Sequence, residues 1–268
     1  MANPKQIRFW AEKLKELSQN DPYSMYTYYT ALIAADWWEG SVREVLTNDS
    51  KRKDEAILTG DSAVISQALM SLSEYYHRID KPDSSVYWAK QMYDYTTNFN
   101  KISYVLRSIS YKPETAPEMR AIFDSLVTDF KARMPREIWG LMTSFGNYFD
   151  AILVHDTATQ IESFKEINEI STDNHGEQAY QLGRLLILFG QYKEGIPYVD
   201  QFVEGEYRSN DAYRYLSCQW LLGRAYEGLG DNQKAVEHYQ VVMKYWGKAD
   251  VQIEQLKDSR ERLAKLTS

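Results

Sequence analysis

Two pairs of an aromatic residue and an arginine offer the clearest chemistry in this sequence. Tyr180 and Arg184 are four residues apart, and so are Trp220 and Arg224. On an α-helix this spacing places both side chains of a pair on one side. An arginine can form two parallel hydrogen bonds to a carboxylate, and the adjacent ring can pack a side chain of a bound peptide. The chemistry of both pairs is therefore the binding of an acidic group.

The residue types that usually carry catalysis are present but are not arranged for it. The histidines are scattered, and none belongs to a His-Glu-x-x-His pattern for zinc; they are His77, His155, His175 and His238. There is no phosphate-binding loop and no Gly-x-Ser-x-Gly elbow. Cys218 is the single cysteine, so no disulfide and no cysteine metal site can form within the chain. We therefore expect no enzyme activity, no bound metal and no cofactor.

The segments that must position the two pairs are copies of one another. Residues 182–195 and 222–235 both contain Leu-Gly-Arg in an apolar helical pattern, followed by a glycine, a polar turn and a small residue. Gly183 matches Gly223 and Gly190 matches Gly230, and the offset along the chain is the same for both matches. A fixed period in this range is typical of an array of helical repeats.

Apolar residues at spacings of three and four predict helices along the rest of the chain. We expect one helix to start at Pro4, capped by Asn3, and a second at Pro22. Helix pairs are predicted across residues 62–93, 102–130 and 135–164, and a last helix from Val251 to about Leu266. After Gly40 the pattern predicts only a short helix, followed by a polar connection over residues 48–54. No segment alternates with period two, so we expect no sheet.

The charge and the composition of the chain argue against some classes of partner. The net charge of -7 opposes binding to a polyanion, so we expect neither nucleic acid nor an anionic membrane as a partner. No run approaches the roughly 18 to 20 apolar residues of a membrane span. The N-terminal segment lacks the apolar core of a signal peptide, which predicts a cytoplasmic location; a secreted or periplasmic location stays open if a signal has been removed.

Arranged as helix pairs, the two copies resemble the tetratricopeptide repeat family. The second copy matches the family pattern at Leu222, Gly223, Tyr226, Leu229, Gly230, Ala235 and Tyr239, and the first at Leu182, Gly183, Leu186, Gly190 and Gly195. Upstream segments share the rhythm of the helix pairs, and the period between the two copies exceeds the family's usual repeat of about 34 residues. The resemblance implies an all-α solenoid of about six antiparallel helix pairs, a TPR-like superhelix with a C-terminal capping helix.

We expect a single domain over residues 1–268. It would consist of divergent helix pairs over 1–134, clearer repeats over 135–247 and a capping helix over 250–267. The segments 245–250 and 260–264 resemble the end of bacterial-type TPR modules, which implies the C-terminal part of a larger regulatory protein.

The glycines inside the predicted helices need a packing reason, because each costs about 1 kcal/mol relative to alanine. We expect Gly183 to pack on Gly195, and Gly223 on Ala235, so that paired helix axes approach closely. Packing does not require the arginine that follows each of these glycines, so the arginines are the candidates for function.

In the tetratricopeptide repeat family, the first helix of each pair lines a concave groove. The resemblance places on this face Tyr180, Arg184, Trp220, Arg224, Asn147 and Glu227. It implies a non-catalytic module for protein–protein interaction that holds an acidic or C-terminal peptide segment in the groove. The lysine and asparagine set of the family's chaperone-tail binders is absent here, so that particular activity is not implied.

Three alternatives stay open on the residues alone. Arg184 and Arg224 could form salt bridges within the array while Tyr180 and Trp220 pack between repeats. A helical-toroid enzyme acting on carbohydrate would also be rich in helix pairs; a closed ring around a deep acidic pocket would favour it, and an open superhelix would favour the interaction module. An oligomerisation or sensory segment of a regulatory protein would pair through the aromatic-rich residues 10–38, and the oligomeric state is open.

Overall fold

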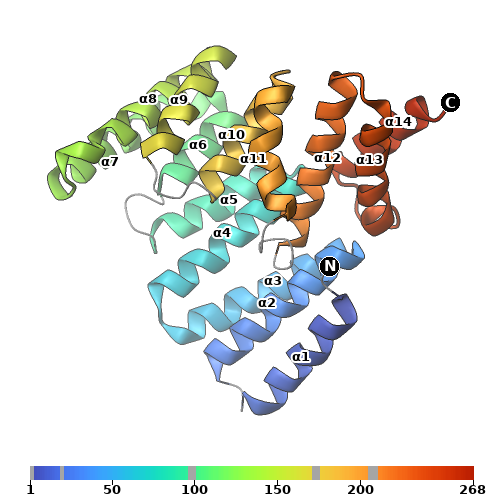
Figure 1. Ribbon diagram of the computed structural model, residues 1–268. Helices are drawn as coiled ribbons and strands as arrows, with labels where there is room; N and C mark the ends of the chain where they lie inside the picture. Colours follow the sequence, from blue (N-terminus) through green and yellow to red (C-terminus); the bar gives the residue numbers. More distant parts are fainter. Residues whose placement is uncertain (1–2, 19–20, 96–100, 171–175, 205–210) are drawn as a thin grey trace.

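The chain folds into helices throughout the part that the structure describes (Figure 1). The computed structural model describes residues 3–18, 21–95, 101–170, 176–204 and 211–268 and contains no strand in these ranges. In chain order the helices are α1 (Pro4–Leu17), α2 (Pro22–Glu39), α3 (Val42–Thr59), α4 (Ser62–Arg78), α5 (Pro82–Tyr93), α6 (Lys101–Tyr111), α7 (Ala116–Arg133), α8 (Trp139–Leu153), α9 (Thr157–Ile170), α10 (Glu177–Leu188), α11 (Tyr192–Glu204), α12 (Ala212–Gly228), α13 (Asn232–Trp246) and α14 (Glu254–Leu266). Two short 3₁₀ helices, Pro113–Thr115 and Arg136–Ile138, precede α7 and α8.

Consecutive helices pack on one another along the whole array. The most extensive contacts join α1 to α2, α2 to α3, α4 to α5, α8 to α9, α10 to α11 and α12 to α13, and smaller contacts join the remaining neighbours along the chain. Short connections favour antiparallel neighbours, and α14 packs on α13 and α12 at the end of the array. The predicted all-α solenoid of helix pairs with a capping helix is confirmed.

The two sequence copies form equivalent turns. Gly190 and Gly230 both adopt a positive φ, 84° and 81°, directly after α10 and α12. A side chain would be strained in this conformation, which glycine adopts without cost. Sequence spacing and backbone geometry thus agree for α10–α11 and α12–α13.

The packing of the helical glycines confirms one predicted contact and shows a different nearest neighbour at the second glycine. A Cβ added to Gly183 would lie 3.3 Å from the carbonyl oxygen of Gly195 and 2.7 Å from the Cβ of Tyr198, so α10 and α11 do meet closely there. A Cβ added to Gly223 would instead lie 2.5 Å from the ring of Tyr239. The fully buried ring of Tyr239, one turn after Ala235 on α13, is thus the nearest neighbour of the glycine, and the contact of Gly223 with Ala235 stays a prediction.

The segment after Gly40 is one continuous helix, so the predicted short helix with a polar connection over residues 48–54 is wrong. Its polar side chains are paired inside the protein: Asn48 donates to Asp36 at 2.8 Å, and Asp49 forms a buried ion pair with Arg52 at 2.5 Å. Burial raises the pKa of Asp49 to about 6, and the charge of Arg52 offsets part of that rise. The polar run resembles a loop in sequence because its partners lie on other turns and helices.

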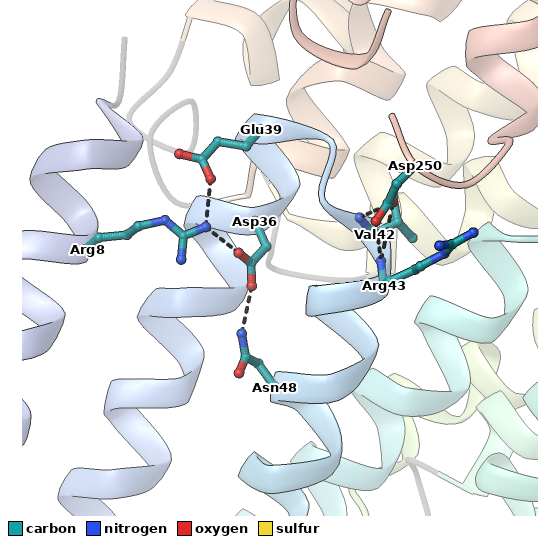
Figure 2. A network of polar contacts seen from close by, with 7 residues as sticks. All are labelled: Arg8, Asp36, Glu39, Val42, Arg43, Asn48 and Asp250. Atoms are coloured by element: carbon teal, nitrogen blue, oxygen red, sulfur yellow. Dashed lines mark hydrogen bonds and ion pairs between the residues drawn. The ribbon is translucent and has the colours of Figure 1, made fainter. Parts of the chain in front are cut away.

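A polar network ties the first three helices together (Figure 2). The fully buried Asp36 of α2 accepts hydrogen bonds from Arg8 of α1 and Asn48 of α3. Arg8 also binds Glu39 at 2.6 Å. Burial raises the pKa of Asp36, and the hydrogen bonds from Arg8 and Asn48 offset part of the rise. A buried carboxylate is tolerated here because its oxygens are paired.

The two ends of the array meet. In Figure 1 the chain turns back on itself, so that α12 and α13 lie against α2. The indole of Trp246 donates to the carbonyl oxygen of Trp37 at 2.9 Å, and the rings of Trp37 and Tyr213 are 5.0 Å apart. Trp37 and Trp38 are both buried in this contact, so they pack within the chain and not on a second copy. The superhelix is therefore not open.

A carboxylate from the far end of the sequence caps α3 (Figure 2). Asp250 accepts a hydrogen bond from the backbone N–H of Val42 at 2.8 Å, while Ser41 makes no side-chain capping bond. The N–H of Asp250 in turn donates to the carbonyl oxygen of Gly40 at 3.2 Å. A Cβ on Gly40 would lie 3.1 Å from Ala249, so the close approach of the two segments needs a glycine at this position.

Candidate functional site

A pocket of about 150 Å³ lies where α4, α10, α12 and α14 converge. We call it the Arg184 pocket. Its lining residues are Glu74, His77, Arg78, Tyr180, Gln181, Arg184, Tyr213, Arg214, Trp220 and Gln255. The structure thus brings together three of the residues predicted from the sequence, Tyr180, Arg184 and Trp220.

Aromatic rings form the walls of this pocket. Tyr180 is only 8% exposed, and its ring lies edge-on to Phe202 at 5.6 Å. Tyr213 accepts a hydrogen bond from Gln255 at 2.9 Å. Burial raises the pKa of both tyrosines, so their hydroxyls stay protonated at neutral pH and can donate hydrogen bonds.

Two of the three arginines in the pocket have acidic neighbours. Arg78 lies 3.7 Å from Glu74, and its guanidinium stacks over the ring of Tyr213 at 3.9 Å. Arg214 lies 3.6 Å from Asp211 and covers the ring of Tyr180. These contacts fix both guanidinium groups and neutralise part of their charge. The Arg184 pocket is basic, in contrast to the acidic pocket expected of a carbohydrate-active toroid.

Arg184 differs from its neighbours because it forms no hydrogen bond or ion pair with any residue that the structure describes. It is half-buried on α10, four residues after Tyr180. Burial raises the pKa of Tyr148, Tyr180 and Tyr213, and the positive charge of Arg184 offsets part of each rise. A half-buried guanidinium with five donors and no acceptor among the described side chains can receive an external anion.

A second cavity, of about 380 Å³, also has Arg184 in its wall. It lies among α6, α8, α9 and α10. Its lining residues are Ile109, Ser110, Pro113, Tyr148, Ile152, Leu153, His155, Thr157, Gln160, Arg184, Leu185, Leu188 and Phe189. We call it the apolar cavity, since aliphatic and aromatic side chains predominate in its lining. Arg184 is the residue that the two cavities share.

The second copy of the predicted pair is bound by the capping helix. The indole of Trp220 donates to Asp258 of α14 at 2.7 Å, and Arg224 lies 3.8 Å from the same carboxylate. Glu227 accepts hydrogen bonds from Arg262 and from the hydroxyl of Tyr239, both at 2.9 Å. Arg224 and Glu227 therefore have charged partners within the chain. This agrees with the alternative that the arginines of the array form internal salt bridges, as far as Arg224 is concerned.

Asn147 is exposed on α8 and lines neither cavity. Its neighbour Tyr148 lines the apolar cavity instead. The residue of α8 that faces a cavity is therefore one position later than predicted, because α8 does not keep the spacing of the two clear copies. The sequence shows this irregularity: Phe145-Gly146 fits the repeat pattern only with a shift of one position.

The sequence did not point to Glu74, Arg78, Arg214 or Gln255 as pocket residues. They come from α4, α12 and α14; α12 packs on α10 as the next repeat of the array, whereas α4 lies far from α10 in the sequence. Arg214 had a weak local signal, since it follows Asp211 by three residues at a helix start. Nothing in the local sequence links α4 to α12.

Among the described residues no group of three or more histidine, cysteine, aspartate or glutamate side chains is placed to hold a metal ion. His175 lies outside the described residues. No helix in the described ranges is long and apolar enough to cross a membrane.

Comparisons with known proteins add little to this geometry. No family model and no curated protein sequence matches the chain. Among solved structures, the chain is similar to the one described as "TPR2AB-domain:pHSP90-complex of yeast Sti1", with a TM-score of 0.36 and 10% sequence identity over 99% of this chain and 98% of that one. A likeness of this degree assigns neither a function nor a partner, and the fold described above rests on the helix packing of the chain itself.

Proposed function

We propose that this chain is a non-catalytic protein-interaction module that binds an acidic group of a partner protein at Arg184. The observation that carries the proposal is the half-buried guanidinium of Arg184, which has no acceptor among the described residues although it lines two cavities. A desolvated arginine gains most from a bidentate carboxylate, because this pairs two of its donors at once.

The surroundings of Arg184 favour one carboxylate at a time. Arg78 and Arg214 already have acidic neighbours within the chain, so they supply a positive potential but fewer free donors. The hydroxyls of Tyr180 and Tyr213 are protonated donors in the same pocket. In a chain with a net charge of -7, this local basic surface would attract an acidic segment that the rest of the protein repels.

A carbohydrate-active enzyme is less well supported by this pocket. Such enzymes generally use two carboxylic acids that flank the scissile bond. Of the described residues that line the Arg184 pocket, Glu74 alone is a carboxylic acid, and it lies 3.7 Å from Arg78. The pocket thus supplies cations and neutral donors, which suits the binding of anions.

The test is a selection of random heptapeptides, displayed either with a free C-terminus or internally, on the wild-type chain. We expect enriched peptides to carry a carboxylate whose removal abolishes binding. Arg184→Gln should lower the affinity of these peptides by about 10- to 100-fold, in line with the loss of one charged hydrogen-bonding partner. Arg224→Gln is the matched control, since it removes the equivalent arginine of the other copy and should leave affinity within about twofold. Selection of neutral peptides, or equal binding by Arg184→Gln, would reject the proposal.

A further inference from the structure

The apolar cavity lies where three helices end. Ser110, Leu153 and Leu188 of its lining belong to the last turns of α6, α8 and α10, and Gln160 extends the lining to α9. The Arg184 pocket is lined from α4, α10, α12 and α14, so α10 alone of the described helices lines both. The apolar cavity is therefore a separate binding volume that meets the Arg184 pocket at one guanidinium.

The walls of the apolar cavity favour an apolar occupant. The hydroxyl of Ser110 donates to the carbonyl oxygen of Leu106 at 2.8 Å, and the side-chain amide of Gln160 donates to that of Ala151 at 3.3 Å. These polar groups of the lining are thus paired within the chain. The ring of Phe189 is 40% exposed. Apolar surface that remains in contact with water in a concave site is stabilised when an apolar group covers it.

The charge of the lining specifies one end of the occupant. Among the described residues that line the cavity there is no carboxylic acid, and Arg184 supplies a guanidinium. Burial raises the pKa of Tyr148, so its hydroxyl stays protonated and is a further donor. A molecule with an apolar body and one carboxylate would use both the walls and the guanidinium, since a carboxylate accepts two parallel hydrogen bonds from arginine.

The size of the cavity limits the apolar body. Its volume is about 380 Å³. Sites for small molecules begin at about 300 Å³, and an apolar cavity of about 150 Å³ is large enough for benzene. On this scale the apolar cavity holds a body of about ten carbon atoms. That is the size of a free organic acid with a medium-length chain.

Arg184 cannot serve both cavities equally well at one time. A carboxylate that reaches it from the apolar cavity takes up the planar fork of the guanidinium. A second carboxylate in the Arg184 pocket would leave a net negative charge on a half-buried group, which is unfavourable. The two ligands should therefore compete.

We propose that the apolar cavity binds a free monocarboxylic acid with an apolar body of about ten carbon atoms, and that this acid displaces the acidic group of the partner protein from Arg184. The displacement rests on the proposed function, whereas the binding of the acid can be measured without a partner. The cavity would then make the protein interaction dependent on a small molecule.

The probes for the acid site are butanoate, octanoate, octanamide and octylamine, each below the concentration at which it forms micelles. Isothermal titration calorimetry measures their affinity for the wild-type chain. Octanoate should bind at least about tenfold more tightly than butanoate, because each further buried CH₂ contributes roughly a factor of four. Octanamide should bind at least about tenfold more weakly than octanoate, and the cationic octylamine should not bind. Equal affinity for octanoate and octanamide, or for octanoate and butanoate, would overturn the acid site.

Two variants fill the apolar cavity from exposed positions of its lining, Ser110→Trp on α6 and Thr157→Trp on α9. Each should lower the affinity for octanoate at least about tenfold, since the tryptophan takes the place of the apolar body. Thr143→Trp, at an exposed position of α8 that lines neither cavity, is the matched control and should bind octanoate as wild type does. The use of two positions keeps the test valid if one variant misfolds.

The displacement is tested with the carboxylate-bearing heptapeptides of the selection. Saturating octanoate should raise their apparent Kd for the wild-type chain at least about tenfold, and octanamide should not. In Ser110→Trp and Thr157→Trp the peptides should bind as they do to wild type, and octanoate should no longer displace them.

The outcomes separate this inference from the proposed function. Selection of carboxylate-bearing peptides without any binding of octanoate would overturn the acid site and leave the proposed function intact. Binding of octanoate that leaves the peptide affinity unchanged would overturn the displacement. A heptapeptide selection that fails while octanoate binds would reject the proposed function and, with it, the displacement, but would support the acid site.

Discussion

The two copies of Leu-Gly-Arg are alike in packing and different in electrostatics. Gly183 and Gly223 both let a neighbouring side chain approach closer than a Cβ would allow. Arg224, however, lies beside Asp258 of the capping helix, whereas Arg184 has no acidic partner in the described chain. The leucine and the glycine therefore serve packing in both copies, while the arginine is paired with a carboxylate in one copy and has no such partner among the described residues in the other.

Position in the array explains this difference. α12 is followed by α13 and then by α14, which brings Asp258 and Arg262 to its surface. α10 lies inside the array, packs on α9, α11 and α12, and has Arg184 at the pocket that it forms with α4 and α12. A terminal repeat needs a cap that satisfies its exposed polar groups, and an internal repeat can leave such a group for a ligand.

The largest expected effect is a loss of stability when the helical glycine of either copy is replaced, which tests whether both copies pack in the same way. Gly183→Val and Gly223→Val should each destabilise the fold by about 3 kcal/mol, because both force a side chain into a closely packed helix interface. Denaturant unfolding monitored by circular dichroism measures the free energy of unfolding. Gly190→Ala is the control: its Cβ meets open space, and the strain of a positive φ should cost only about 1 kcal/mol. A loss confined to one of the two valine variants would break the equivalence of the copies.

The next largest effect on stability is expected at Asp258 of the capping helix α14. Asp258→Ala removes the acceptor of Trp220 and the partner of Arg224 and Arg262, so we expect a loss of about 2 kcal/mol in the free energy of unfolding. Asp258→Asn keeps one acceptor oxygen and should lose less. A loss below about 0.5 kcal/mol for the alanine variant would show that α14 does not hold the second arginine.

A smaller effect is expected for Arg224→Gln. The pair with Asp258 is long, 3.8 Å, and partly exposed, so its removal should cost at most about 1 kcal/mol. High salt should reduce this cost, because salt screens partly exposed charges. The measurement is the difference in unfolding free energy between wild type and variant at low and high ionic strength. A cost that does not change with salt would point to lost packing on Trp220 as the cause.

The smallest effect on stability is expected for Arg184→Gln, within about 0.5 kcal/mol of wild type, since no described contact is lost. The same variant should show the largest loss in peptide binding. Arg184→Gln should thus reduce binding more than stability, and Arg224→Gln should reduce stability more than binding. This contrast between the two arginines is the most direct test of the comparison. A destabilisation above about 1 kcal/mol for Arg184→Gln would mean that the arginine has a structural partner.

The solenoid could be predicted from the sequence because its signals are local. The spacing of apolar residues and the constant offset between the two copies both report on neighbouring turns and helices, and both hold in the structure. The error at α3 has a physical cause as well: Asn48, Asp49 and Arg52 resemble loop residues, yet they are neutralised by partners inside the fold. Composition alone does not distinguish a paired polar residue from a solvated one.

The candidate site could be predicted only in the part that lies on one helix. Tyr180 and Arg184 share a face of α10, and the sequence shows that directly. Arg214 joins them from the next repeat, α12, and Arg78 joins them from α4, which is distant in the sequence. Arg224 differs from Arg184 because of Asp258, which belongs to a helix beyond the repeat that carries Arg224. Such long-range partners depend on the superhelical path, which no short sequence pattern encodes.

The cap that Asp250 places on α3 has a consequence for the order of events during protein synthesis. The ribosome makes α3 early, but the side chain that satisfies its first N–H groups belongs to a residue 208 positions later. Until then the growing chain holds α1–α3 with an uncapped helix start, an exposed pair of tryptophans and no wall on one side of the pocket. Synthesis must pass Asp250 before α1–α3 reach their final form, so a chain that stops before this residue would be altered in its first three helices, at the opposite end of the array.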